Sequence, residues 1–341
     1  MQTRSLRLAA LAVAFLAAPA VAWAKVTLIV SSWVPPTHTI TQSITKWCDE
    51  VSQATANRVV CSLLPKAVSA PPATFDSIRD ALADVSFGTP GYTPGRFVLT
   101  QIAELPFSGD SAEVNSVAYQ RIYERHLAPI DEYKGLKVLA VFTHGPGGIY
   151  NSKRPIRALQ DLQGLKFRVG GGMVNEIGKA IGANVTVKPA TESYELLSTG
   201  VMDGVFFPAE SIASFKLEKL LRYRTDFPGG LYNTSFAFVM NADTWKRIPK
   251  PDQDIIAKLS GEHAARLFGR GWDAADTHGV TAMREAGVQM LQADKAMVED
   301  VRKRTAPLEQ KWISEAKAAG LADPAAVLQE FRAEVAKATK P

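Results

Sequence analysis

The segment GLKFRVGGG, residues Gly164 to Gly172, places an arginine at the end of a short apolar strand and follows it with three glycines. Because side chains alternate along a strand, Phe167 and Val169 face the protein interior while Arg168 points to the opposite side. A guanidinium donates two parallel hydrogen bonds to a carboxylate and stays charged when it is removed from water. The glycines, Gly171 among them, let a ligand approach the backbone and lead into a helix whose N-terminal amides attract anions. We therefore predict an anion site at this strand end, and the alternative is a surface arginine beside a flexible loop.

Strands and helices alternate along the chain on both sides of this segment. Apolar runs at residues 26–33, 58–64 and 83–88 predict strands, and a helix that buries Ile40 and Trp47 separates the first two. The same order recurs later, with strands predicted at 135–142, 161–169, 184–189 and 202–207. This alternation predicts an α/β fold of two similar, doubly wound lobes with parallel sheets.

The last third of the chain is predicted to be almost entirely helical. A strand at 235–240 is expected to return to the first lobe, and Ile256, Leu259, His263 and Leu267 then lie at the spacing of one helix that extends to about residue 282. A second long helix is expected at 294–319. We expect residues 25–144 and 235–275 to form the first lobe and residues 145–234 and 276–335 the second. The long C-terminal helices either brace the two lobes or cover their cores.

Two longer runs of sequence surround Arg168 and follow it. They are KRPIRALQDLQGLKFRV and PATESYELLSTGVMDGVFFP. Both resemble the DctP-type solute-binding proteins of tripartite ATP-independent periplasmic (TRAP) transporters, in which a DLxGxKxR strand precedes a P-x-E-x-Y-x-x-L-x-x-G-x-x-D-G motif. The likeness extends from about Val26 to Lys317. It implies two α/β lobes that close around an organic acid, with Arg168 holding the carboxylate, and delivery of that acid to large and small permease subunits in the membrane.

The chain departs from the family pattern in two places. Many members that bind sialic acid or dicarboxylates carry a second arginine on the preceding strand, but none stands between Phe142 and Asn151 here. Phe206 and Phe207 precede Pro208 where the family often has an asparagine. The pocket is therefore expected to be less polar than usual, with Phe207 in its wall. We predict a monocarboxylate with an apolar or aromatic body, an aryl acid or a 2-oxo acid.

The resemblance also brings other side chains to the cleft. Trp33 and His38 flank the first strand-to-helix turn, and Trp33 either stacks on a ligand ring or packs within its lobe. Tyr92 and Arg96 are the large polar residues of a glycine- and proline-rich loop, and we expect one to reach the ligand and the other to fix the loop. His144 either donates a hydrogen bond to a ligand oxygen or is structural.

One acidic residue is expected beside the same cleft. Glu210 follows the second motif and would repel a bound acid unless it meets a hydroxyl, an amine or a cation of the protein. We therefore give it no ligand contact, and we predict neither a metal site nor a cofactor.

The first 24 residues are typical of a secretory signal peptide. Arg4 and Arg7 precede an apolar run, and an A-x-A pattern ends at Ala24. Lys25 stands where a lipid anchor would need a cysteine. A free periplasmic protein is predicted, and an uncleaved N-terminal anchor is the alternative.

The chain contains two cysteines, and thiols are oxidised in the periplasm where the protein is expected. Cys48 and Cys61 are expected to form a disulfide between the first helix and the next strand, and two buried free thiols are the alternative.

Several function classes are excluded by composition and motifs. Removing residues 1–24, with two arginines and no acid, lowers the net charge from +5 to +3, and no long basic block indicates a nucleic-acid partner. The chain has no CxxC pair, GxSxG elbow, HExxH motif or P-loop, so we predict no enzyme. The remaining alternative is a receptor of another system, namely a tricarboxylate carrier, an ABC importer or a sensor kinase. The protein is expected to be a monomer or a dimer.

Overall fold

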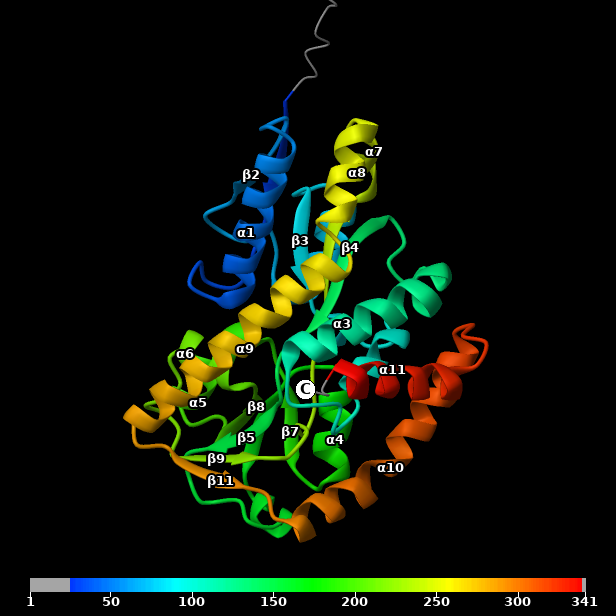
Figure 1. Ribbon diagram of the computed structural model, residues 1–341. Helices are drawn as coiled ribbons and strands as arrows, with labels where there is room; N and C mark the ends of the chain where they lie inside the picture. The colour runs from blue at the N-terminus through cyan, green and yellow to red at the C-terminus, as the bar shows by residue number, and fades with distance from the viewer. Residues whose placement is uncertain (1–24, 339–341) are drawn as a thin grey trace, which may run out of the picture.

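The computed structural model describes residues 25–338, which form two α/β lobes joined by three crossings of the chain (Figure 1). The predicted signal peptide lies outside the described residues. The sheet of the first lobe has the strand order β2-β1-β3-β10-β4. Its strands are β1 (Val26–Val30), β2 (Val59–Leu63), β3 (Val85–Gly88), β4 (Leu136–Thr143) and β10 (Ser235–Asn241).

The sheet of the second lobe has the order β11-β9-β5-β8-β6-β7. Its strands are β5 (Gly148–Asn151), β6 (Lys166–Val169), β7 (Asn184–Val187), β8 (Gly204–Phe207), β9 (Tyr223–Asp226) and β11 (Gln289–Gln292). The chain crosses from the first lobe to the second between β4 and β5 and returns between β9 and β10. The third crossing is helix α9 (Glu262–Glu285).

Both sheets are mixed, which corrects the expectation of parallel sheets. β1 runs parallel to β2 and β3, but β10 is antiparallel to both of its neighbours, β3 and β4. In the second lobe β6 is parallel to β7 and β8, and β5 is antiparallel to β8 and β9. In each sheet one strand is reversed, β10 in the first lobe and β5 in the second, and each enters its sheet from the other lobe without an intervening helix. β11, which follows the crossing through α9, is parallel to β9. The expected return of residues 235–240 to the first lobe is confirmed.

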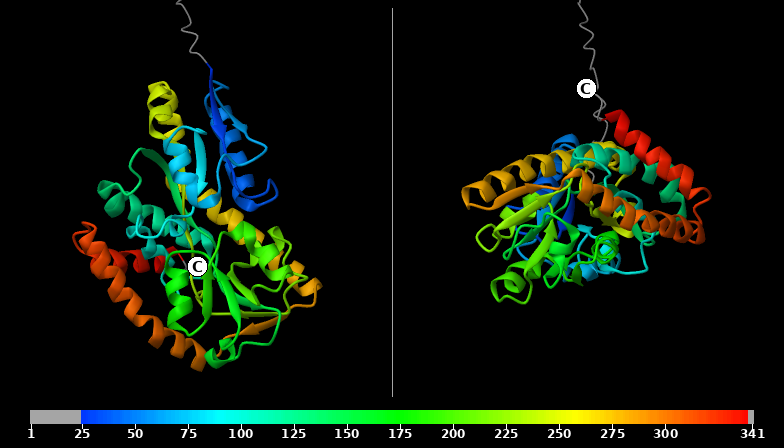
Figure 2. Two further views of the ribbon diagram at one scale, coloured as in Figure 1. Left: turned by 180° about the vertical axis from the view of Figure 1, so that it is seen from behind. Right: turned by 90° about the horizontal axis from the view of Figure 1, so that it is seen from below.

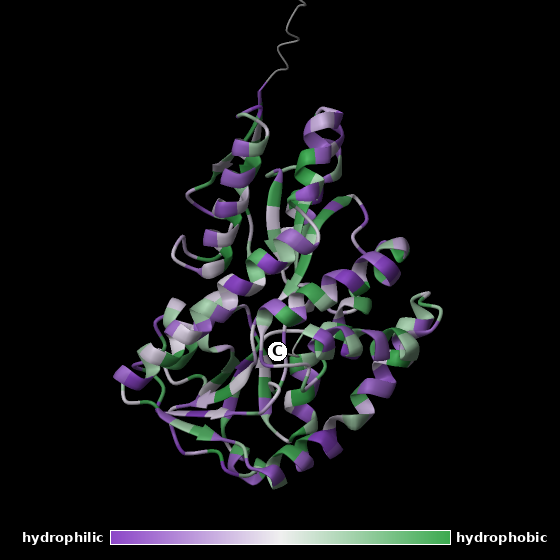
Figure 3. Cartoon of the chain, in the orientation of Figure 1, coloured by the Kyte–Doolittle hydropathy of each residue, from purple (hydrophilic) through white to green (hydrophobic). Residues whose placement is uncertain are grey.

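Apolar strand sequences and their burial account for the layers. Every residue of β3, β8 and β10 is buried, because helices and loops cover both faces of these strands. Figure 3 shows β4 as mostly hydrophobic, whereas α7 (Ala242–Arg247), α8 (Lys250–Lys258) and α10 (Lys295–Ala318) carry many hydrophilic residues. The other helices are α1 (Thr39–Ala54), α2 (Thr74–Arg79), α3 (Ala112–Ile122), α4 (Met173–Ala180), α5 (Ser193–Ser198), α6 (Ala209–Ser214) and α11 (Pro324–Ala338).

The C-terminal helices connect the two lobes. The prediction of one unbroken helix from residue 256 to 282 is wrong. Helix α8 ends at Lys258, and α9 begins only after Gly261, whose φ of +58° interrupts the helical path. Helix α9 packs on α1 and α3 of the first lobe and on α6 of the second. The helix expected at 294–319 is confirmed as α10, which contacts α4, while α11 packs against α3 of the first lobe (Figures 1 and 2).

One apolar core is continuous between the lobes. It contains Ile102 and Tyr119 from the first lobe and Phe167 and Met173 from the second, and Trp312 of α10 joins it. Two smaller cores lie under α1 and around α5 and α6. Because the tail covers both lobes, the boundaries at residues 275 and 335 remain a proposal.

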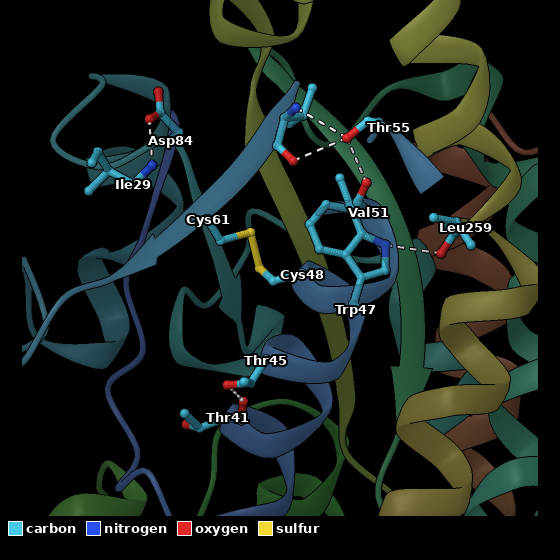
Figure 4. Close-up of a disulfide and its surroundings, with 11 residues drawn as sticks. Ile29, Thr41, Thr45, Trp47, Cys48, Val51, Thr55, Cys61, Asp84 and Leu259 are labelled. Atoms are coloured by element: carbon cyan, nitrogen blue, oxygen red, sulfur yellow. Dashed lines mark hydrogen bonds between the residues drawn. A yellow bond between two sulfur atoms is a disulfide. The ribbon is translucent and has the colours of Figure 1, made fainter. Parts of the chain in front are cut away.

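A disulfide joins Cys48 on α1 to Cys61 on β2 (Figure 4). From the preceding residue of the same helix, the indole nitrogen of Trp47 donates a hydrogen bond to the carbonyl of Leu259 at 3.0 Å. These two links fix α1 to the sheet and to the end of α8, and α1 begins at the cavity described next.

Candidate functional site

A cavity of about 40 Å³ lies between the lobes. It is bounded by the carboxyl ends of β1, β3, β6 and β8, by the crossings and by α9, which is where open α/β sheets bind ligands. Of the residues predicted for the site, six line it, and four aromatic residues join them. The six are Trp33, His38, Tyr92, His144, Arg168 and Phe207, and the four are Phe215, Tyr232, Phe236 and Trp272.

Arg168 is buried in the wall of this cavity without a negative partner. It stands on β6 between the buried Phe167 and Val169 and is 2 % exposed. Its Nε donates to the carbonyl of Lys188 at 2.9 Å, and the guanidinium carbon lies 4.5 Å from the ring centre of Phe207. Within residues 25–338, no carboxylate oxygen lies within 4.0 Å of its nitrogens. A desolvated charge is unfavourable unless it is paired, so this guanidinium provides a site for an anion.

The hydroxyl of Tyr92 completes the anion site from the first lobe. Tyr92 ends a short 3₁₀ turn, η2 (Pro90–Tyr92), directly after β3. Its oxygen accepts a hydrogen bond from Nη2 of Arg168 at 3.1 Å and another from the backbone N–H of Ala190 at 2.9 Å. With both acceptor positions occupied, the hydroxyl hydrogen is left to donate. Arg168 and Tyr92 can therefore both donate to one carboxylate.

Arg96 and Gly171 do not line the cavity. Arg96 pairs with Asp76 at 2.7 Å and lies over the ring of Phe97 at 5.0 Å, so it fixes the loop while Tyr92 reaches the cavity. A Cβ on Gly171 would lie 1.6 Å from the carbonyl oxygen of Gly91. Gly171 therefore permits the close approach of two loops from opposite lobes. The prediction that Arg96 and Gly171 contact the ligand is therefore corrected. The neighbouring Gly170 lines the cavity instead of Gly171.

The N-terminus of α4 binds an anion of the protein itself. The buried carboxylate of Glu104 accepts hydrogen bonds from Met173 N at 2.9 Å, from Ser235 N at 3.1 Å and from Ser235 Oγ at 2.6 Å. Burial raises the pKa of Glu104, and these three donors oppose that effect. The expectation that the amides of this helix attract the ligand is corrected. Glu104 ends the short helix η3 (Leu99–Glu104), and no pattern in the sequence marks it.

His144 has both ring nitrogens occupied by backbone groups. Its Nε2 accepts a hydrogen bond from Thr234 N at 3.0 Å, so Nδ1 carries the proton and donates to the carbonyl of Gly145. Burial lowers the pKa of His144 to about 4, so the ring is neutral at pH 7. This arrangement favours the structural alternative, in which His144 presents its ring to the cavity and orders the crossing between β4 and β5.

His38 and Glu210 contact each other across the two lobes. Nδ1 of His38 caps α1 by accepting from Ile40 N at 3.2 Å, and its Nε2 lies 3.4 Å from Oε2 of Glu210. Burial lowers the pKa of His38, although the charge of Glu210 opposes this shift. Glu210 also accepts hydrogen bonds from the hydroxyls of Ser211 and Ser214. It thus has the hydroxyl and imidazole partners that keep it away from a bound acid.

Aromatic rings form most of the remaining wall. Trp33 packs on Phe87 with 4.6 Å between ring centres, and its Nε1 donates to the Phe87 carbonyl at 3.3 Å. Phe207 stacks on Phe215 at 5.9 Å, and Phe236 stacks on Trp272 at 6.0 Å. The cavity thus combines one buried cation with a largely aromatic surface, which suits a carboxylate on an aromatic body.

Sequence reasoning missed four aromatic members of this wall. Phe215 ends α6, Tyr232 lies on the return crossing, Phe236 on β10 and Trp272 on α9. Each stands in an ordinary apolar pattern, and the last three reach the cavity only because the chain crosses between the lobes. Within the described part of the chain, no group of three or more His, Cys, Asp or Glu side chains is placed to hold a metal ion.

Residues 30–316 match the family model of bacterial extracellular solute-binding proteins, family 7, also called DctP. The chain belongs to this family. A TRAP solute-binding protein from Bordetella bronchiseptica, with (R)- and (S)-mandelate bound, is 47 % identical with a TM-score of 0.89, over 92 % of this chain and 99 % of that one. One from Rhodoferax ferrireducens with benzoate is 28 % identical with a TM-score of 0.86, over 92 % and 98 %. A marine metagenome protein with 3-hydroxybenzoate is 29 % identical with a TM-score of 0.87, over 93 % and 100 %.

This DctP-family protein thus shares its fold with proteins that bind extracellular solutes. From residue 25 to residue 338, none of its helices is both long and apolar enough to cross a membrane.

Proposed function

We propose that this protein captures an aromatic monocarboxylate in the periplasm and delivers it to the membrane permease of a TRAP transporter. The observation that carries the proposal is the buried guanidinium of Arg168, which has no carboxylate partner in residues 25–338 and faces an aromatic cavity. The three solved relatives hold mandelate, benzoate and 3-hydroxybenzoate, all aromatic acids with one carboxylate.

Binding requires positioning and no covalent step. The ligand carboxylate accepts hydrogen bonds from the free N–H groups of Arg168 and from the hydroxyl of Tyr92, while its ring packs against Phe207 and Trp33. Closure of the lobes removes water from the site, which strengthens the charge interaction because the local dielectric constant falls. A permease that contacts both lobes then recognises the closed, loaded form, and the ligand is released unchanged.

Calorimetric titration of the ligand-free mature protein tests the proposal. Benzoate, mandelate and phenylglyoxylate are the expected ligands, and succinate and glucuronate serve as controls with a second charge or a polar body. We expect at least one aromatic acid to bind with a Kd of about 1 μM or lower and to raise the melting temperature. Selective binding of succinate or glucuronate would contradict the aromatic assignment, and conversion of the ligand into a product would contradict a binding role.

Two further measurements test the location and the partner. Sequencing the N-terminus of protein recovered from the periplasm is expected to give Lys25 as its first residue. Uptake of the identified acid into membrane vesicles that contain the permease subunits is expected to depend on added binding protein. Uptake without it would contradict the delivery role.

A further inference from the structure

Most polar groups of the cavity wall have hydrogen-bond partners within the protein. Trp33 Nε1 donates to a carbonyl, both nitrogens of His144 bond to backbone groups, and Ser211 donates to Glu210. The indole nitrogen of Trp272 and the hydroxyl of Thr89 are the exceptions. Both are buried and have no hydrogen-bond partner among residues 25–338, and of the two only the indole nitrogen is restricted to donating.

The aromatic rings that contact Trp272 have no acceptor to offer it. Its ring lies 5.5 Å from that of His38, 5.7 Å from that of His144 and 6.0 Å from that of Phe236. The unprotonated nitrogens of the two histidines already accept hydrogen bonds from the backbone, and phenylalanine has no acceptor atom. A buried donor that lacks a partner is unfavourable, so an acceptor supplied by a ligand would stabilise the complex.

A series of ring contacts leads from the anion site to Trp272. From Arg168 the contacts lead to Phe207, then to Phe215 at 5.9 Å, then to His38 at 5.8 Å, and finally to Trp272. Trp272 also belongs to α9, whereas Arg168 and Tyr92 belong to β6 and η2. Trp272 and Arg168 line the cavity from different elements, so a ligand whose carboxylate meets Arg168 can present its ring to the indole.

We propose that the indole N–H of Trp272 donates a hydrogen bond to an oxygen substituent on the aromatic ring of the ligand. The site then favours ring-hydroxylated aromatic monocarboxylates over their unsubstituted parents. This inference rests on the proposed function, because it assumes that an aromatic acid occupies the cavity, and it names Trp272 as the residue that sets ring selectivity.

Titration of matched ligand pairs tests the inference. Benzoate is compared with 3- and 4-hydroxybenzoate, and mandelate with 4-hydroxymandelate. Each pair is titrated into the wild type, Trp272→Phe and Trp245→Phe. Trp245→Phe is the control, because the half-buried indole of Trp245 lies on α7 outside the cavity. We expect the wild type to bind at least one hydroxylated isomer about tenfold more tightly than its parent, as for one recovered hydrogen bond. Trp272→Phe should reduce this ratio to about twofold or less by losing affinity for the hydroxylated acid alone. Trp245→Phe should keep the ratio of the wild type.

Three results would overturn the inference. They are a wild type that prefers no hydroxylated isomer, a Trp272→Phe protein that keeps the preference, and an equal loss of affinity for both members of a pair, which indicates packing alone. If Trp272→Phe does not fold, the wild type with 3- and 4-methylbenzoate decides, because a methyl group fills the space of the hydroxyl but accepts no hydrogen bond. Failure of every aromatic acid to bind the wild type would instead refute the proposed function.

Discussion

Nη2 of Arg168 and the hydroxyl oxygen of Tyr92 lie 3.1 Å apart, and they belong to different lobes. The same oxygen accepts the backbone N–H of Ala190 at 2.9 Å, so one hydroxyl joins the first lobe to two groups of the second. The anion site is therefore complete only when the lobes are together. Binding of the carboxylate and closure of the cleft are two results of one set of hydrogen bonds.

Replacing Arg168 with alanine should abolish most of the affinity. The ligand carboxylate would lose its only buried cationic partner, and we expect the Kd of benzoate or mandelate to rise by about 30-fold to several-thousand-fold in calorimetric titration. Arg168→Lys should restore only part of the affinity, because an ammonium lacks the two-pronged geometry. Arg96→Ala is the matched control, since Arg96 pairs with Asp76 outside the cavity. Equal affinities for Arg168→Ala and the control would refute the assignment.

Tyr92→Phe should weaken binding and closure together. The variant keeps the ring but removes the acceptor for Arg168 and Ala190 and the donor to the carboxylate. We expect about a tenfold rise in Kd, as for one or two hydrogen bonds, and a larger radius of gyration in small-angle scattering at saturating ligand. A variant that binds tenfold more weakly but scatters like the closed wild type would show that Tyr92 contacts the ligand without joining the lobes.

Gly171→Ala should oppose closure, although Gly171 does not line the cavity. The new methyl group would overlap the carbonyl of Gly91 in the other lobe. Gly170→Ala is the comparison, because a Cβ there meets only Val174, at an ordinary 3.8 Å. Scattering with saturating ligand should leave Gly171→Ala more open than Gly170→Ala, with both proteins folded by circular dichroism. Equal compactness of the two variants would refute the steric role.

The two-lobed fold and its central arginine could be predicted because local patterns encode them. Alternating side chains on β6 place Arg168 opposite Phe167, and apolar strands separated by helices define an α/β lobe. The break at Gly261 could not be predicted, because the apolar spacing continues through it and only a positive φ interrupts the helix. The reversed strands could not be predicted either, because β10 and β5 enter their sheets directly from the other lobe, whereas β11 enters through a helix and is parallel to its neighbour.

Part of the site depends on contacts that no local pattern records. Trp272 and Tyr232 reach the cavity only through the crossings of the chain, and Glu104 meets the N-terminus of α4 from a short 3₁₀ helix with no recognisable motif. His144 was identified as a member of the wall, but its hydrogen bonds depend on Thr234, which is distant in sequence. The sequence thus indicates which residues lie at the site more readily than it indicates their hydrogen-bond partners.

Removing the disulfide should lower stability and leave binding nearly intact. The bond between Cys48 and Cys61 closes a loop with a sequence separation of 13, and a loop of this size contributes about 3 kcal/mol. Cys48→Ser with Cys61→Ser should therefore reduce the free energy of unfolding in urea by about 2–3 kcal/mol. Affinity should change by no more than about twofold, because Cys48 lies some 15 Å along α1 from His38. Reductant should destabilise the wild type and have no effect on the variant. A variant as stable as the oxidised wild type would contradict the prediction.

Asp276 should make stability fall as the pH rises. It lies on α9, where Oδ1 accepts the backbone N–H of Glu210 at 2.7 Å and Oδ2 has no partner in residues 25–338. Burial raises the pKa of Asp276 from 3.8 to about 8 against the opposing effect of the hydrogen bond from Glu210 N. The charges of Glu210 and Asp273 also raise the pKa, and that of Arg224 lowers it. Between these two pH values the folded protein holds a proton that the unfolded chain releases. Its stabilising effect is therefore complete below pH 3.8 and is lost as the pH rises through 8.

Asp276→Asn isolates this effect, because asparagine keeps an acceptor for Glu210 N and does not titrate. Urea unfolding of both proteins at pH 5 and pH 8 should show the variant gaining at least about 1–2 kcal/mol relative to the wild type at the higher pH, since each unit of pKa shift corresponds to about 1.4 kcal/mol. His144, whose pKa is lowered to about 4, acts with the opposite sign between pH 4 and 6.5, but it is present in both proteins and cancels in the difference. A difference that stays constant from pH 5 to pH 8 would mean that Asp276 is already ionised in the folded protein.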